Sequence, residues 1–340
     1  MRKFLGRFFT YLGIPVLLLG ILYAVADPFK VLRPFSLSYV NEDYRDYVSS
    51  ELFLLNNPEV HYNSFIFGSS RCGGLNTWHW KKYLPGDARQ YLFQSWSESV
   101  TGIWQKLAFL DRKDNPIDNV LIVLDAPGSF APVQLNRGSI YLKDWRISGE
   151  SPITWHLTHF YNFLQKPSFW FRTVKALFHP VASELSSDPL TNDYEPDNRF
   201  LELSVPPQRD SLKNCSAKNK AVFMKIVEKG EPAGEGEIVI NRKMKGILKD
   251  IQAILTRHKT DYRILISPAP CYTSTQINSQ DFLTLQQIFG EENVFDFSGV
   301  NEITTDCQTF SDPAHFDRHA GWIILESVYN APSQLCTPSQ

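Results

Sequence analysis

The sequence has few cysteines and no concentrated block of charge. Five cysteines in 340 residues are too few for a disulfide scaffold, and their spacing matches no zinc-binding pattern. The net charge is −2 with no basic block in the body of the chain, which argues against nucleic acid as a partner, since binding it needs a concentrated positive surface. A hydrophobic content of 43% with 21% charged residues is typical of a folded protein with a sizeable core and excludes a disordered one.

One long stretch near the N-terminus lacks charge altogether. Residues 8–26, FFTYLGIPVLLLGILYAVA, follow three basic residues and precede Asp27. A membrane-spanning helix needs roughly 20 apolar residues, and positive charge before it predicts a cytoplasmic N-terminus with the main domain periplasmic or extracellular. The alternative is a cleaved signal peptide and a secreted or periplasmic protein, because Ala24-Val25-Ala26 fits a small-x-small cleavage site. We favour a single-pass protein with residues 1–34 as anchor and linker.

Beyond residue 35, short apolar runs alternate with segments of helical periodicity. Strand-length runs occupy residues 63–67, 89–93, 119–124, 262–266 and 293–297, and helical patterns occupy 44–55, 100–110, 241–258, 282–289 and 314–329. Continuous apolar strands suit a parallel sheet that helices cover on both faces. The pattern therefore predicts a three-layer α/β/α sandwich with a central parallel sheet over residues 35–335.

The middle of the chain, residues 131–238, interrupts this alternation and is interpreted as an insertion or cap. It is rich in aromatic rings and histidines, including Trp145, Trp155, His156, His159, Phe160, Trp170 and Phe171. Stacking of these rings on sugar faces would suit a polysaccharide. We favour ordinary core packing or a position at a membrane interface, where Trp and Tyr collect.

Two segments far apart in the chain carry residues suited to nucleophilic catalysis. The first predicted strand ends at Gly68 and is followed by Ser69, Ser70 and Arg71. Near the other end, the spacing of Asp312 and His315 lets a carboxylate hold the imidazole by its Nδ1–H and leaves Nε2 as a base. A serine hydroxyl is a weak nucleophile unless such a base accepts its proton. We predict Ser70 as nucleophile, His315 as base and Asp312 as the residue that orients the base.

This order of blocks resembles the SGNH/GDSL hydrolase superfamily. Gly68-Ser69-Ser70 is similar to its first block, with Ser69 where Asp is usual, and Asp312 with His315 is similar to its last block. The likeness loosely covers residues 63–125 and 241–330. It is closest to a membrane-anchored extracytoplasmic branch that includes the D-alanyl transfer protein of teichoic-acid modification and proteins that O-acetylate alginate and other polysaccharides.

The resemblance implies an acyl-ester enzyme that transfers an acyl group, such as acetyl, to a cell-envelope or secreted polysaccharide through a covalent acyl-enzyme. It also implies an acyl donor, a polysaccharide acceptor and a multi-span membrane O-acyltransferase as partners, with no cofactor. The alternatives are a periplasmic carbohydrate esterase or deacetylase, and an inactive accessory subunit of a membrane O-acyltransferase system.

The sequence departs from the superfamily at the oxyanion hole. The superfamily uses a Gly of its second block and an Asn of its third, whereas the corresponding stretches here read FQSWSES and VLDAPGSF. Ser95, Ser97 and the backbone of residues 126–129 are candidate substitute donors. Asp125 is interpreted as a site residue or a strand-exit turn, and Arg71 as a binder of an anionic substrate group or a member of a structural salt bridge.

Two further residues near these blocks have ordinary interpretations. His319 follows His315 by four residues, but no third metal ligand accompanies the pair, so we expect no metal. Cys72 is expected to be a buried structural residue.

Overall fold

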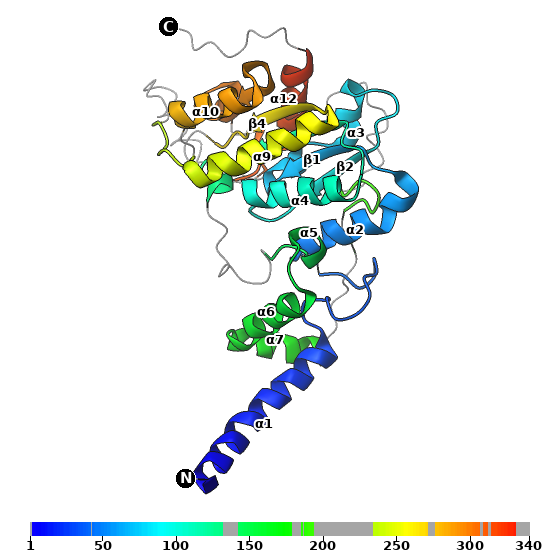
Figure 1. Ribbon diagram of the computed structural model, residues 1–340, viewed down its shortest axis with the longest axis vertical. Helices are drawn as coiled ribbons and strands as arrows, with labels where there is room; N and C mark the ends of the chain where they lie inside the picture. Colours follow the sequence, from blue (N-terminus) through cyan, green and yellow to red (C-terminus); the bar gives the residue numbers. More distant parts are fainter. Residues whose placement is uncertain are drawn as a thin grey trace.

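The structure is a computed structural model that describes residues 2–41, 43–131, 142–178, 185, 187–193, 234–270, 276–306, 309–311 and 314–330. The described residues form an α/β fold around a five-stranded parallel sheet with the order β2-β1-β3-β4-β5 (Figure 1). The strands are β1 (Ser64–Gly68), β2 (Gln90–Gln94), β3 (Asn119–Leu124), β4 (Asp261–Ile266) and β5 (Val294–Asp296). The predicted parallel sheet is confirmed, and every strand end lies within one residue of its expected position.

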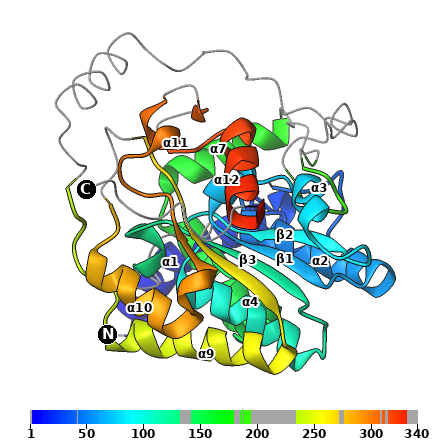
Figure 2. The ribbon, with the colours of Figure 1, turned by 90° about the horizontal axis from the view of Figure 1, so that it is seen from above.

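Helices cover both faces of the sheet, as Figure 2 shows. One face carries α2 (Arg45–Val60), α4 (Val100–Arg112), α9 (Arg242–His258) and α10 (Ser279–Phe289). The other carries the 3₁₀ turn η1 (Ser70–Gly74), α3 (Thr77–Trp80), α11 (Glu302–Thr305) and α12 (Arg318–Asn330). Because side chains alternate along a strand, Phe65 and Phe67 enter the first core and Ile66 enters the second. Short 3₁₀ turns η2 (Lys81–Tyr83), η3 (Gly128–Phe130) and η6 (Glu291–Asn293) complete the domain.

A third group of helices lies away from the sheet. It consists of α1 (Arg2–Ala26), α6 (Pro152–Leu164) and α7 (Pro167–Phe178), with α5 (Trp145–Ser148) leading to them. Figure 1 shows α1 pointing away from the domain, with α6 and α7 beside its C-terminal end. The residues that join these helices are aromatic, including Tyr23, Phe29, Trp155 and Phe163, which are all buried. Part of the aromatic middle therefore packs as core.

Among the residues that the structure describes, no helix combines the length and the apolar character that crossing a membrane requires. The apolar run of residues 8–26 includes positions of α1 whose side chains lie outside the description. The N-terminal anchor therefore stays a prediction.

Two predicted helix boundaries move because side chains cap the helices elsewhere. The closing helix was expected from residue 314, but α12 begins at Arg318, where the carboxylate of Asp317 accepts the N–H of Ala320 at 2.8 Å. The helix expected from residue 282 begins at Ser279, because the side chain of Asn278 accepts the N–H of Gln280 at 2.9 Å. An oxygen side chain that accepts an otherwise unpaired backbone N–H fixes a helix start.

Candidate active site

The candidate site lies at the carboxyl ends of the strands, between β1 and β3. After β1 the chain moves to β2 on one side, then returns to β3 on the other side of β1. In open α/β sheets, ligands bind at the point where the strand order reverses in this way. Ser69 and Ser70 follow β1 at this point, and Asp125 follows β3.

The turn after β1 presents Ser70 at the start of η1. Ser69 caps this turn, since its hydroxyl accepts the N–H of Arg71 at 3.2 Å and donates to the carboxylate of Asp125. Gly68 is required for the close approach of β1 and β3, because a Cβ there would lie 2.9 Å from the Cβ of Val123. Ser70 therefore begins η1 directly after the carboxyl end of β1.

The structure brings Ser70 and His315 together, as predicted. The Ser70 Oγ lies 2.8 Å from Nε2 of His315, although 245 residues separate the two in sequence. This is the distance at which a neutral imidazole accepts a hydroxyl proton as a general base. Asp312, predicted to orient the histidine, lies outside the described residues.

Backbone hydrogen bonds hold the loop that carries His315. The N–H of Ser311 donates to the carbonyl of His315 at 2.9 Å, and the N–H of Asp317 donates to the carbonyl of Thr309 at 2.8 Å. Between them, Phe310 and Phe316 form a β-bridge and enter the second core. The histidine is thus fixed by main-chain contacts on both sides.

Two glycines let this loop and α12 reach the nucleophile turn. A Cβ on Gly321 would lie 2.0 Å from the carbonyl oxygen of Gly74, and a Cβ on Gly74 would lie 2.6 Å from the ring of Phe316. Both distances are far below ordinary van der Waals contact. The contact between η1 and α12 depends on glycine at these two positions. The approach of Ser70 to His315 depends on that contact.

Asp125 joins three neighbouring elements beside the nucleophile turn. Besides Ser69 from the β1 turn, its carboxylate accepts the hydroxyl of Ser267, which follows β4, at 2.8 Å. Arg71 donates to the same Ser267 hydroxyl at 3.2 Å, and its Nε lies 3.9 Å from Asp125. Arg71 is therefore in ion-pair range of Asp125 beside Ser70, and a role of either residue in substrate binding stays a prediction.

The sequence did not single out Ser267. The signal for it was its position directly after the fourth predicted strand, at the same sheet edge as Ser70 and Asp125. Polar residues that follow parallel strands converge at one edge, so this position was predictable in principle.

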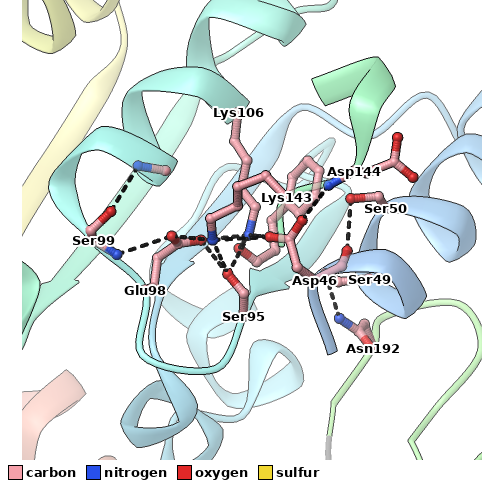
Figure 3. A network of polar contacts seen from close by, with 12 residues as sticks. Asp46, Ser49, Ser50, Ser95, Glu98, Ser99, Lys106, Lys143, Asp144 and Asn192 are labelled. Atoms are coloured by element: carbon pink, nitrogen blue, oxygen red, sulfur yellow. Dashed lines mark hydrogen bonds and ion pairs between the residues drawn. The ribbon is translucent and has the colours of Figure 1, made fainter. Parts of the chain in front are cut away.

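A buried ionic network holds the loop between β2 and α4 (Figure 3). The Lys106 ammonium lies 2.7 Å from Glu98 and 3.2 Å from Asp46, and the Lys143 ammonium lies 2.5 Å and 3.1 Å from the same two carboxylates. Burial alone would raise the pKa of Asp46, but Lys143 and Lys106 lower it to about 2. The same two lysines lower the pKa of Glu98 against the effect of burial, so both acids are ionised and the four charges balance.

Ser95 belongs to this network. Its hydroxyl donates to Glu98 at 2.5 Å and accepts from Lys143 at 2.6 Å and from Lys106 at 3.2 Å. Its backbone N–H donates to the carbonyl of Gly68 at 3.2 Å. The side chain predicted as an oxyanion donor is 2% exposed and has its proton committed to Glu98, so Ser95 supports the loop beside β1.

The other candidate oxyanion donors differ in whether their N–H or hydroxyl group is already used in a hydrogen bond. Ser97 is exposed and has φ +46°, in the left-handed region that favours glycine. The N–H of Ser129 already donates to the carbonyl of Asp125 at 2.7 Å, and Pro127 has no N–H. Ser97 and the backbone of Ala126 and Gly128 therefore remain as candidates. Residues in strained backbone regions collect at functional sites.

Cys72 has the properties expected of a structural residue. It is fully buried, and its thiol donates to the carbonyl of Ser69 at 2.8 Å. Burial raises the pKa of this thiol well above its usual value, which disfavours the reactive thiolate. The thiol instead stabilises the turn that presents Ser70.

The chain matches no protein-family model, and no curated protein matches it at a significant level. Geometry and chemistry of the site are therefore the grounds on which its function is proposed.

Proposed function

We propose that the chain is a serine-dependent acyl-ester enzyme of the SGNH type, with Ser70 as nucleophile and His315 as general base. One observation carries this proposal, the 2.8 Å contact between the Ser70 Oγ and Nε2 of His315 at the switch point of a parallel sheet. The capping of η1 by Ser69 and the close packing of Gly74 on α12 support it, because both hold the two reacting groups in place.

The proposed reaction proceeds in two steps. In the first, Nε2 of His315 takes the Ser70 proton while Oγ attacks the carbonyl of an acyl donor, and the departing group receives that proton from the histidine. In the second, a sugar hydroxyl gives its proton to His315 and attacks the acyl-Ser70 ester. His315 returns that proton to the departing Ser70 Oγ, which releases the acylated sugar and restores the free serine. Asp312 is proposed to orient His315. We propose that Ser97 and the backbone N–H groups of Ala126 and Gly128 donate hydrogen bonds to the negatively charged oxygen that forms in each step.

We propose transfer to a cell-envelope or secreted polysaccharide, by a protein held at a membrane through α1 and working beside a multi-span O-acyltransferase. The support is the order of the sequence blocks and the surface of α1, on which Ile14, Leu17, Leu18, Ile21 and Val25 are each more than half exposed. Exposed apolar side chains on one helix mark a surface that meets lipid or protein.

A second candidate is an accessory subunit that keeps the fold without turnover. The commitment of the Ser95 hydroxyl to the ionic network favours it, since loss of one oxyanion donor costs about 10²–10³ in rate in the reference case. The contact between Ser70 and His315 favours the enzyme, because a scaffold does not require it.

The experiment offers full-length protein p-nitrophenyl acetate, with and without an oligosaccharide acceptor, and measures nitrophenol release and acetylated sugar. We expect an acetyl group on Ser70 by mass spectrometry, faster turnover with the acceptor, and loss of both in Ser70→Ala. The matched control is Ser279→Ala, an exposed serine on α10. Hydrolysis that the acceptor does not change would support an esterase, and an absence of acetyl-enzyme and of product would support the accessory subunit.

A further inference from the structure

The helices α6 and α7 each expose an apolar stripe. On α6, Ile153, Leu157 and Tyr161 follow one another at spacings of four, and they are 70%, 60% and 58% exposed. On α7, Phe171 and Phe178 are 77% and 76% exposed. Residues at these spacings lie on one face of a helix, and in a water-soluble domain such a face is turned toward the core.

The opposite sides of these helices already have a core of their own. Phe163 of α6 is buried beside Tyr23 of α1, and Trp155 of α6 is buried beside Tyr47 of α2. The indole of Trp155 donates to the carbonyl of Lys143 at 2.8 Å, and the indole of Trp170 on α7 donates to the carbonyl of Phe163 at 2.7 Å. Hydrogen bonds and buried rings therefore hold the inner sides of α6 and α7 in place, while their apolar stripes face outward.

The charged side chains of α6, α7 and the residues between them are all basic. Residues 151–178 contain no aspartate or glutamate, whereas Lys166, Arg172 and Lys175 are basic and exposed. Helices that lie in the plane of a membrane combine Phe, Trp and Leu with Lys and Arg in this way. Basic residues near an anionic leaflet are attracted to its negative surface potential.

The helix α6 packs on α1, which also carries exposed apolar side chains. The ring of Tyr23 on α1 lies 5.2 Å from that of Phe160 and 5.4 Å from that of Phe163, so α6 packs directly on α1. Figure 1 shows α6 and α7 side by side at this end of α1, away from the sheet. The exposed apolar side chains of three helices therefore gather in one part of the molecule.

We infer that the α6–α7 pair is an in-plane membrane-binding element, which places its two apolar stripes at the boundary of headgroups and acyl chains of an anionic bilayer. The inference shares with the proposed function the premise that the chain works at a membrane, and it does not require a helix that crosses one. The indole of Trp155 on α6 is hydrogen-bonded to the backbone of Lys143. The side chain of Lys143 belongs to the ionic network beside the β1 turn. The bilayer contact thereby sets the orientation of the Ser70 site relative to the membrane surface.

The test reconstitutes the full chain into vesicles of equal parts phosphatidylglycerol and phosphatidylcholine that contain a lipid-soluble carbene photolabel. Mass spectrometry then maps the label. We expect peptides spanning 152–178 to be labelled severalfold more than the peptide with Leu283, an exposed apolar residue on α10. In vesicles of phosphatidylcholine alone, the labelling of 152–178 falls relative to that of α1.

Matched variants refine the result. A Leu157→Ser/Phe171→Ser/Phe178→Ser triple variant loses the label on 152–178, whereas Leu283→Ser leaves it unchanged. Label on α1 alone overturns the inference and leaves the anchor standing. Label on 152–178 without α1 supports the inference and overturns the anchor, and label on neither overturns both. A dimer in which a second copy shields the stripes also overturns it. Acetylation of Ser70 in the same sample reports on the proposed activity independently.

Discussion

Gly321→Ala tests whether the contact between η1 and α12 sets the geometry of the site. The new Cβ would lie 2.0 Å from the carbonyl oxygen of Gly74 and 2.7 Å from its carbon. Carbon–oxygen contacts need more than about 3 Å, so the two elements must separate by about 1 Å. Alanine in a helix interior is otherwise better than glycine by about 1 kcal/mol, while overpacking costs about 1–3 kcal/mol. The predicted net effect is a loss of about 0–2 kcal/mol in the free energy of unfolding.

The effect on reactivity is predicted to be larger than the effect on stability. Ser70 lies on η1, and His315 lies three residues before α12, so a separation of about 1 Å breaks their 2.8 Å contact. A misplacement of this size costs about 10²-fold in rate. The assay combines urea unfolding with the rate of acyl-Ser70 formation.

The matched control is Gly246→Ala, at an exposed position of α9 where a Cβ meets nothing within 4 Å. It is expected to raise the free energy of unfolding by up to about 1 kcal/mol and leave reactivity unchanged. A Gly321→Ala protein with unchanged stability and unchanged reactivity would refute the reasoning.

Three other tests, each built on named substitutions, have defined outcomes. Lys106→Met removes a fully buried ammonium from between two buried carboxylates and is expected to lower the free energy of unfolding by about 3–5 kcal/mol in urea. The control Lys249→Met, on the exposed face of α9, is expected to change it little. Equal effects of the two substitutions would contradict the network. Gln94→Met is expected to be neutral or stabilising, because the buried amide has no hydrogen-bond partner among the residues that the structure describes. Asn192→Leu loses hydrogen bonds of 2.7 Å and 3.0 Å and is expected to be strongly destabilising; the reverse order would refute this. Burial raises the pKa of Asp193 from 3.8 to about 6, so the folded state binds the proton more tightly and the free energy of unfolding falls as pH rises from about 4 to about 6. In denaturation at several pH values, Asp193→Asn should lack this component, and an unchanged pH dependence would contradict it.

The sheet was predictable because its strands are continuous apolar runs. NVLIVL at residues 119–124 is β3 without a shift of either end, since a central parallel strand is buried on both faces. The meeting of Ser70 and His315 was predictable for a related reason. The carboxyl end of β1 places Ser70 at the ligand-binding edge of the sheet, and the order of the two blocks predicted His315 as its base.

The ionic network was not predictable, because no local pattern connects its members. Asp46 lies 97 residues before Lys143, and the lysine belongs to a segment without strand or helix periodicity. Only the fold brings them together under the loop that contains Ser95. Sequence reasoning consequently treated Ser95 as a candidate donor to substrate, when its hydroxyl is used inside the network.

The helices of the middle segment were not predicted for a different reason. Both sides of α6 carry apolar residues, with Trp155 buried and Leu157 60% exposed, so the contrast between faces that reveals a helix is weak. Aromatic content alone indicated core or membrane interface. The exposure of the outer stripes is a property of the fold, and the sequence pattern does not contain it.

The central claim is that His315 activates Ser70, and covalent labelling tests it most directly. The full chain is treated with a fluorophosphonate probe, and the adduct is located by mass spectrometry in the unmodified protein, in Ser70→Ala, in His315→Ala and in the Ser279→Ala control. The account predicts an adduct on Ser70 that is absent from the first two variants and retained in the control. A folded protein that takes no label, or that takes it on Ser70 equally well without His315, would contradict the account.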